Sequence, residues 1–232
     1  MHAQSDYDPR ALERRESGCF DIAPHRLSMS ERMWGIRFRQ LLPLEVARGI
    51  FAVVSDFERT MSFAIQNYST IFESDPKDMR FFPDPLTDAK RRYYLEMGDF
   101  FEFIENDRTV GFLILTPHDW STCYIRGAGA LPSHLGKRLG SRLLAHLTEP
   151  LREAGVQRLE ADTSPSNLAV IHLLARDRYN PTGMVLTDRW GAHIKLTKFL
   201  ARPAEDAFLR QYCTGINYQQ RAAGDPSQPR KE

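Results

Sequence analysis

The stretch that most constrains the fold of this chain is Pro-Ser-His-Leu-Gly-Lys-Arg-Leu-Gly-Ser at 132–141. Small and apolar residues at 124–131 precede it and predict a strand, and leucines at helical spacing follow it and predict a helix. The first N–H groups of a helix lack intrahelical acceptors and carry the positive end of its dipole. Because Gly136 and Gly140 have no Cβ, an anion can approach this backbone closely. The sequence therefore predicts a site for a phosphate-bearing ligand where the helix begins.

Two common phosphate-binding motifs do not fit this stretch. A dinucleotide fingerprint that starts at Gly127 and Gly129 needs a third glycine where Pro132 stands. A nucleotide P-loop that ends at residues 136–137 needs glycine at 131 and Ser or Thr at 138, but the chain has Leu131 and Arg138. A strand–turn–helix whose glycines serve only the turn geometry stays open as an alternative.

The stretch resembles the acetyl-CoA pyrophosphate loop of the GNAT acyltransferase superfamily, whose pattern is roughly Pro-x-x-(Arg/Gln)-Gly-x-Gly-(aliphatic)-(Gly/Ala). Four residues match in register, and Leu135 and Arg138 depart from the pattern. The resemblance implies acetyl-CoA or another acyl-CoA as co-substrate, with no metal. The residues that it assigns to the co-substrate are Gly129, Ala130, Leu131, Leu135, Gly136, Lys137, Arg138, Leu139, Gly140, Ser141 and Asn167.

Hydrophobic periodicity predicts the other elements. A helix over 139–151 ends at Gly155, a strand follows at 156–161, and a Ser164-Pro165 cap starts a second helix that continues to about 175. A hairpin pairs 183–187 with 192–200. Upstream, we predict a strand at 36–42, mostly helix over 44–72, a helix over 87–97 and a hairpin of 100–105 with 109–115.

This order of elements is similar to the GNAT layout. The resemblance implies an α/β (α+β) GNAT fold, with a mixed, mostly antiparallel sheet of six to seven strands, a central splay and flanking helices. We expect the acyltransferase domain at 31–200. Residues 1–30 are expected to form a charged, poorly ordered arm, and 201–232 a short helix followed by a disordered tail.

Composition is typical of a soluble, cytoplasmic enzyme without a membrane partner. Lys and Arg number 31 against 30 Asp and Glu, so no overall charge favours an anionic polymer or lipid. The three cysteines, Cys19, Cys123 and Cys213, are far apart and are expected to be reduced thiols. The start of the chain has no signal-peptide core, no apolar run reaches 18 residues, and the histidines lack metal-ligand spacing.

The catalytic residues are less well defined by the sequence. Asp162, at the end of a predicted strand, is the first candidate for a general base or substrate anchor, and its alternative role is to cap the helix at Ser164. Cys123 and Tyr179 are further catalytic candidates, and core packing is the simpler account of both. The family often has a tyrosine acid where this chain has Leu174, and Tyr179 is the candidate replacement.

Two weaker candidates lie near strand ends. Glu160 shares a face with Asp162 and is expected at the surface, and His118-Asp119 is expected in a solvated turn. Trp34, Phe81 and Phe82 are candidates for substrate binding in an apolar acceptor groove. Their alternative role is to hold the extra helices against the sheet.

The resemblance implies transfer of an acetyl or other acyl group from CoA to a primary amine of a small molecule or peptide, by direct attack in a ternary complex. One alternative keeps the fold but takes the acyl group from a carrier protein's phosphopantetheine or from an aminoacyl-tRNA. A basic rim at Lys137, Arg138 and Arg142 would suit an acidic carrier. Another alternative is a non-catalytic module. The resemblance is also compatible with a homodimer.

Overall fold

A computed structural model describes residues 27–72, 87–187 and 191–212 of this chain. Phe81, Phe82, Cys19 and Cys213 lie outside the described residues, as do most of the predicted N-terminal arm and C-terminal tail. The described part of the arm, 27–30, holds the cap and the first residues of a helix, because Ser28 and Glu31 form a reciprocal capping box.

One eight-stranded sheet forms the centre of the molecule, with the strand order β1-β2-β3-β4-β5-β6-β8-β7. All neighbouring pairs are antiparallel except β5 and β6, which are parallel. The strands are β1 (Leu44–Ala47), β2 (Ile50–Val54), β3 (Asp99–Glu105), β4 (Arg108–Asp119), β5 (Thr122–Ala130), β6 (Arg158–Thr163), β7 (Asn180–Thr187) and β8 (Gly191–Phe199). The mixed, mostly antiparallel sheet is confirmed, with one strand more than predicted.

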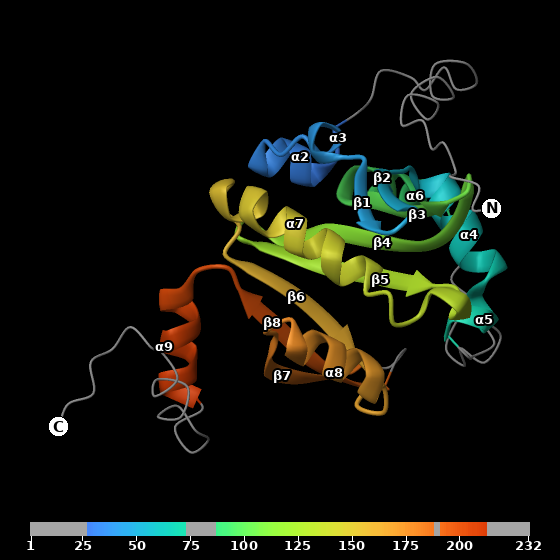
Figure 1. Ribbon diagram of the computed structural model, residues 1–232. Helices are drawn as coiled ribbons and strands as arrows, with labels where there is room; N and C mark the ends of the chain where they lie inside the picture. The colour runs from blue at the N-terminus through green and yellow to red at the C-terminus, as the bar shows by residue number, and fades with distance from the viewer. Residues whose placement is uncertain (1–26, 73–86, 188–190, 213–232) are drawn as a thin grey trace.

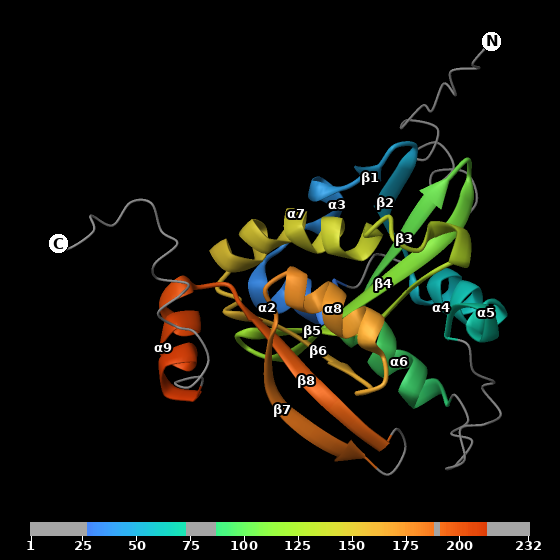
Figure 2. The same ribbon diagram turned by 60° about the horizontal axis from the view of Figure 1, so that its bottom comes forward.

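Helices cover both faces of this sheet (Figure 1). One face, here named the α7 face, carries α2 (Met29–Trp34), α3 (Phe38–Leu41), α7 (Leu139–Glu153) and α8 (Leu168–Arg176). The other, here named the α4 face, carries α4 (Phe57–Gln66), α5 (Tyr68–Phe72) and α6 (Asp88–Met97). A last helix, α9 (Arg202–Tyr212), packs against β8 through the ring contact of Phe199 with Phe208, and Figure 2 shows it beyond the end of the sheet.

Alternation along the strands divides the core between the two faces. In β3 and β4, Phe101 and Leu113 belong to the larger core under α7, whereas Phe100 and Phe112 belong to the smaller core under α4. Successive strand residues point to opposite sides of a sheet, so consecutive residues enter different cores. The same alternation determines which polar side chains of neighbouring strands share a face of the sheet.

The region before residue 55 differs from the prediction. The expected strand at 36–42 is wrong, because Phe38–Leu41 forms a short helix. The expected helix is wrong for 44–54, where β1 and β2 form a hairpin, and right for α4 and α5. Gly49 has a φ of 71° in the turn, a conformation that glycine adopts without strain. Val46, Ile50 and Ala52 are buried, so the apolar spacing reflects a hairpin with one inward face.

The remaining predicted elements are confirmed within a few residues. Thr87 caps α6, Asp56 caps α4, and Gly155 follows α7 with a φ of 92°. The strands at 100–105, 109–115 and 156–161, and the hairpin after α8, correspond to β3, β4, β6 and β7–β8.

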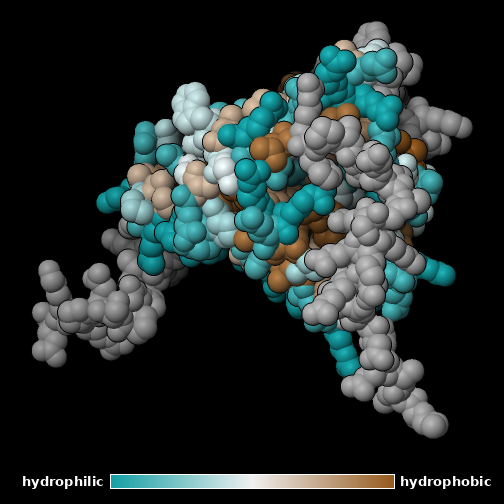
Figure 3. All heavy atoms as spheres, turned by 90° about the horizontal axis from the view of Figure 1, so that it is seen from above, coloured by the Kyte–Doolittle hydropathy of each residue, from teal (hydrophilic) through white to brown (hydrophobic). Residues whose placement is uncertain are grey.

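Most large apolar side chains of the described residues lie in these two cores. On the face seen in Figure 3, hydrophobic side chains show in small groups between hydrophilic ones. None of the described helices is both long enough and apolar enough to cross a bilayer.

Candidate active site

The two parallel strands at the centre of the sheet part before either ends. Their pairing runs from Thr122 opposite Arg158 to Ile125 opposite Ala161. Beyond that point β5 continues to Ala130 on β4, and β6 continues to Thr163 on β8. The edge of β5 at 126–130 that faces β6 therefore has no strand partner within the described sheet. Such an edge can pair with the amide groups of an extended ligand.

Helix α7 begins beside this opening without a side-chain cap. Its N-cap residue, Arg138, has a left-handed φ of 58° and no capping hydrogen bond. The first N–H group of the helix with a backbone acceptor is that of Arg142, which donates to the Arg138 carbonyl. No described residue accepts from the N–H groups of Leu139, Gly140 or Ser141. These donors are left for an anion, as the sequence predicts.

The loop before α7 leaves room for a ligand at its glycines. A Cβ added to Gly140 would meet no atom within 4 Å. Gly136 also has open space around it, and its φ of 79° disfavours any larger residue there. Leu135, which stands where the family usually has Arg or Gln, is 66% exposed.

The positive charges of the loop are held by internal partners. Lys137 lies 3.5 Å from a Glu105 carboxylate oxygen, and the His134 ring lies 2.9 Å from the other. The hydrogen bond from His134, with help from the Lys137 charge, lowers the pKa of Glu105. Arg138 pairs with Asp177 at the end of α8. The predicted basic rim is therefore largely neutralised.

Asn167 caps helix α8, a role that the sequence predicts for Ser164. Its Oδ1 accepts the Val170 N–H at 3.2 Å, which makes Asn167 the N-cap of α8. The predicted cap, Ser164, accepts instead from the Ser166 N–H at 3.3 Å in the preceding turn. Asn167 is exposed, so its amide N–H₂ group can still face a ligand.

A polar cluster lies on the α4 face where the strands part. The Tyr124 hydroxyl donates to Asp162 Oδ2 at 3.3 Å. Asp162 is the first residue of β6 beyond the pairing with β5, and its Oδ1 is buried with no partner in the described chain. Burial, and next the Asp162 charge, raise the pKa of Tyr124 to about 12. Tyr124 therefore keeps its proton at neutral pH and donates a hydrogen bond to Asp162.

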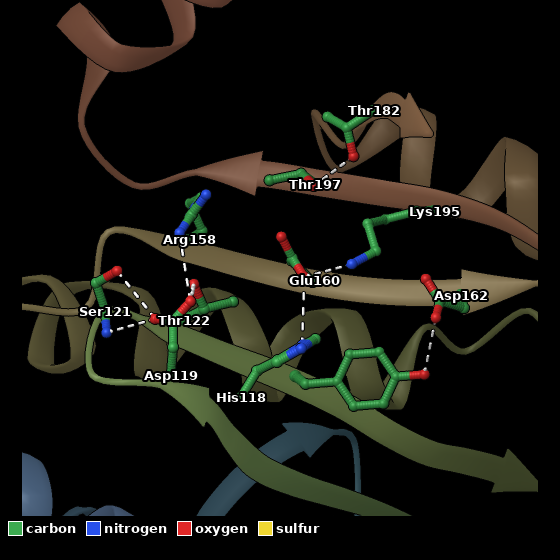
Figure 4. Close-up of polar contacts among 11 residues, drawn as sticks. His118, Asp119, Ser121, Thr122, Arg158, Glu160, Asp162, Thr182, Lys195 and Thr197 are labelled. Atoms are coloured by element: carbon green, nitrogen blue, oxygen red, sulfur yellow. Dashed lines mark hydrogen bonds and ion pairs between the residues drawn. The ribbon is translucent and has the colours of Figure 1, made fainter. Parts of the chain in front are cut away.

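Glu160 joins the same cluster and is not at the surface. It is 8% exposed, and Lys195 on β8 donates to its Oε2 at 3.2 Å. His118 Nδ1 lies 3.5 Å from the same oxygen, and Figure 4 shows these side chains directed toward Glu160 from β4 and β8. Buried carboxylates need such partners, and Lys195 and His118 supply them to Glu160. Asp162 lies on the same strand beyond them.

Asp119, beside His118, stabilises a turn. Its carboxylate accepts from the Ser121 N–H at 2.7 Å and from the Thr122 hydroxyl at 3.0 Å (Figure 4). The described residues contain no group of three or more His, Cys, Asp or Glu side chains arranged for a metal ion.

Cys123 faces the opposite side of the sheet from Tyr124. It is 1% exposed and belongs to the core under α7. Burial, and next the charge of Asp99, raise the pKa of its thiol. Since a nucleophilic cysteine needs access and a lowered pKa, these surroundings argue against a catalytic Cys123.

Tyr179 lies on the α7 face with an unused donor. Its hydroxyl is buried and has no partner among the described residues, and burial raises its pKa. Its N–H donates to the Leu174 carbonyl at 2.9 Å, so it adjoins the position where the family often has a tyrosine. Tyr179 also lines a groove of about 170 Å³ between α7 and the end of α8. The other polar residues of that groove are Arg138, Ser141, Arg142, Asp177 and Lys198.

Trp34 lies away from the opening. It is 9% exposed, and its Nε1 donates to the Trp120 carbonyl at 2.8 Å. Trp120 is in the turn before β5, whereas the strands part toward the other end of β5. This position matches the alternative role, in which the ring packs an added helix against the core.

Sequence reasoning missed Arg126 and Lys195. Both face the α4 side near the opening, Arg126 through a contact with Tyr94 of α6 and Lys195 through Glu160. The two residues are 69 positions apart, and neither lies in a motif. The only local signal was that both belong to predicted strands.

The class of fold follows from comparison with solved structures. A GNAT-family protein from Desulfovibrio desulfuricans has a TM-score of 0.51 at 15% identity, with 66% of this chain and 99% of that chain covered. An N-acetyltransferase from Staphylococcus aureus Mu50 has a TM-score of 0.50 at 19% identity, with 66% and 99% covered. The protein yncA from Salmonella typhimurium, solved with its cofactor acetyl-CoA, has a TM-score of 0.50 at 18% identity, with 66% and 95% covered.

At these identities the likeness shows a GNAT fold and no more. The model of the acetyltransferase (GNAT) family matches residues 65–178, from α4 through the opening to the end of α8. Residues 65–178 therefore form a domain of the GNAT acetyltransferase family. No curated protein sequence matches it.

Proposed function

We propose that this protein transfers an acetyl or similar acyl group from CoA to a primary amine. The observation that carries the proposal is the parting of β5 and β6 beside the uncapped start of α7. An open strand edge and a set of unpaired N–H groups lie next to each other there. Together they suit a ligand that has amide groups and phosphates.

Several residues of the chain would hold the donor. The N–H groups of Leu139, Gly140 and Ser141 would bind the pyrophosphate, and the β5 edge at 126–130 would bind the pantetheine amides. The bound acyl-CoA supplies the thioester carbonyl that the amine attacks. The absence of a Cβ at Gly140 would let the phosphates approach the backbone.

Asp162 is the proposed site for the acceptor amine. Its Oδ1, which is buried and has no partner in the described chain, would bind an ammonium and take a proton from it, so that the nitrogen gains the lone pair needed for attack. Tyr124 would fix the other oxygen of that carboxylate. The new C–N bond forms as the C–S bond breaks, and the departing thiolate needs a proton. Tyr179, whose buried hydroxyl has no partner among the described residues, is the proposed donor of that proton.

The alternatives differ in the donor. The internal pairing of Lys137 and Arg138 removes much of the charge that an acidic carrier protein would contact. A carrier-linked or tRNA-linked acyl group therefore ranks below free acyl-CoA. A non-catalytic module would bind a CoA ester and release no thiol.

Gly140→Val tests the proposal in a thermal-shift titration with CoA, acetyl-CoA and longer acyl-CoAs. The wild-type protein should be stabilised by about 2.7 kcal/mol at a ligand concentration of 100 times Kd. Valine at 140 meets open space inside the protein, so the fold should persist, whereas affinity for CoA esters should fall at least about tenfold because a side chain occupies the phosphate approach.

His146→Val is the matched control, since His146 is exposed on the same helix away from the loop. Unchanged CoA affinity in Gly140→Val would show that this loop does not bind the phosphates. If the protein binds CoA esters but no amine causes thiol release, the non-catalytic module is favoured.

A further inference from the structure

Arg126 is a cation beside the opening, and no described residue gives it an anionic partner. Its guanidinium carbon lies 4.0 Å from the ring centroid of Tyr94 and 5.7 Å from that of Tyr93, both on α6. No carboxylate in the described chain forms an ion pair with it. A guanidinium stacked on an aromatic ring keeps its N–H edges available for a carboxylate with two oxygens.

Other cations near the opening do have such partners. Lys195 binds Glu160, Lys137 lies against Glu105, and Arg138 pairs with Asp177. Arg126 instead depends on the tyrosines of α6 for its position. The Arg126 side chain is only partly exposed, so water solvates its charge only in part.

Asp162, on the neighbouring strand β6, is an acidic residue whose Oδ1 has no partner in the described chain. The last paired residues of β5 and β6 are Ile125 and Ala161, so Arg126 and Asp162 are the first residues beyond the pairing on each strand. No ion pair joins the two. Both lie close enough to Tyr124 to affect its pKa, which the Asp162 charge raises and the Arg126 charge lowers. Within the described residues, a carboxylate with one unpartnered oxygen and an arginine without a carboxylate partner therefore lie on the same side of the sheet where the strands part, both near Tyr124.

We infer that the acceptor is a zwitterion, an amine that also carries a carboxylate, such as a free amino acid. Its ammonium binds Asp162 and its carboxylate binds Arg126 in a charge-assisted pair. This inference rests on the proposed function, because it names the acceptor of that reaction. It makes Arg126 a specificity-determining residue and gives α6 the task of positioning it.

The test measures thiol release from acetyl-CoA with matched acceptors. The panel contains α-, β- and γ-amino acids, together with the amide and the decarboxylated amine of each. We expect at least one amino acid to be used with a kcat/KM about tenfold or more above that of its amide. In Arg126→Gln, the KM for that amino acid should rise about 10- to 100-fold, and the KM for the amide should change little.

Two further variants separate charge from geometry and from folding. Arg126→Lys keeps the charge but loses the planar fork, so its KM should rise less than that of Arg126→Gln. Arg152→Gln removes an exposed arginine at the far end of α7 and should leave the preference unchanged. Thermal shift with CoA reports whether each variant is folded.

The outcomes distinguish the inference from the function beneath it. Amides or decarboxylated amines used as well as the amino acids would overturn the zwitterionic acceptor and leave the acyltransferase intact. A preference that survives Arg126→Gln would overturn the role of Arg126. If no amine of the panel causes thiol release, the proposed function is overturned, and the inference with it.

Discussion

Cys123 and Tyr124 are neighbours in β5, yet they lie in two different chemical environments. Cys123 points to the α7 face, where it is buried among leucines and its pKa is raised by burial. Tyr124 points to the α4 face, where it contacts Asp162 and the His118 ring. One face of the same strand therefore holds neutral groups, and the other holds paired charges.

The difference extends beyond β5. On the α7 face, Asp99 is 6% exposed and Tyr179 is 4% exposed, and each has a buried oxygen without a partner among the described residues. On the α4 face, Glu160 is equally buried but has Lys195 beside it. Burial neutralises an acid unless a counter-charge accompanies it. We therefore propose that proton transfer from the acceptor amine takes place on the α4 face.

The largest effect should come from Asp162→Asn. The amide cannot take a proton from the acceptor amine, so kcat should fall by about 10²- to 10⁴-fold while CoA binding stays unchanged. Steady-state thiol release and a CoA thermal shift measure the two quantities. Glu149→Gln, at an exposed position of α7, is the control for a lost carboxylate. A wild-type kcat in Asp162→Asn would show that another group takes the proton of the acceptor amine, and would contradict the assignment of this step to the α4 face.

The pH dependence of the free energy of unfolding tests the burial of Asp99 on the α7 face. Burial raises its pKa from 3.8 to about 7, against the hydrogen bond from Ser28. Between these values the native protein keeps a proton that the unfolded chain has lost, so stability should decrease with rising pH by up to about 1.4 kcal/mol per unit. The stabilising contribution is complete below pH 4 and lost above pH 7.

Asp99→Asn should flatten this dependence and be more stable than the wild type at pH 8. Urea unfolding at pH 5, 6, 7 and 8 measures it, with Asp88→Asn, exposed at the start of α6, as control. Equal pH dependence in Asp99→Asn and the wild type would show that Asp99 is already ionised in the native protein.

The smallest effects should come from the adjacent pair in β5. Tyr124→Phe removes the hydrogen bond that orients Asp162, and a loss of about fivefold in kcat/KM is expected. Cys123→Ala should leave kcat/KM within about twofold, because the thiol touches only the core, although the lost volume costs stability. Loss of activity in a folded Cys123→Ala protein would restore Cys123 as a candidate catalytic residue.

Much of the fold was accessible to pattern analysis from residue 87 onward. Local signals such as the Thr87 cap, the turn at 106–107 and the leucine spacing of α7 define their elements within a few residues. Upstream, the apolar spacing of Val46 and Ile50 fits a helix as well as a hairpin, and Gly49 was the missed signal. A short apolar run does not reveal which partner it packs against.

For the candidate site, the sequence by itself determined the glycine-bearing loop and the uncapped start of α7, because both depend on residues within one turn of chain. It also indicated Asp162, from the end of a strand. Only the tertiary structure decided that Asp162 meets Tyr124, that Arg138 turns to Asp177, and that Glu160 is buried beside Lys195. These pairs are 35 to 39 residues apart. Strand order and register bring them together, and no local spacing encodes either.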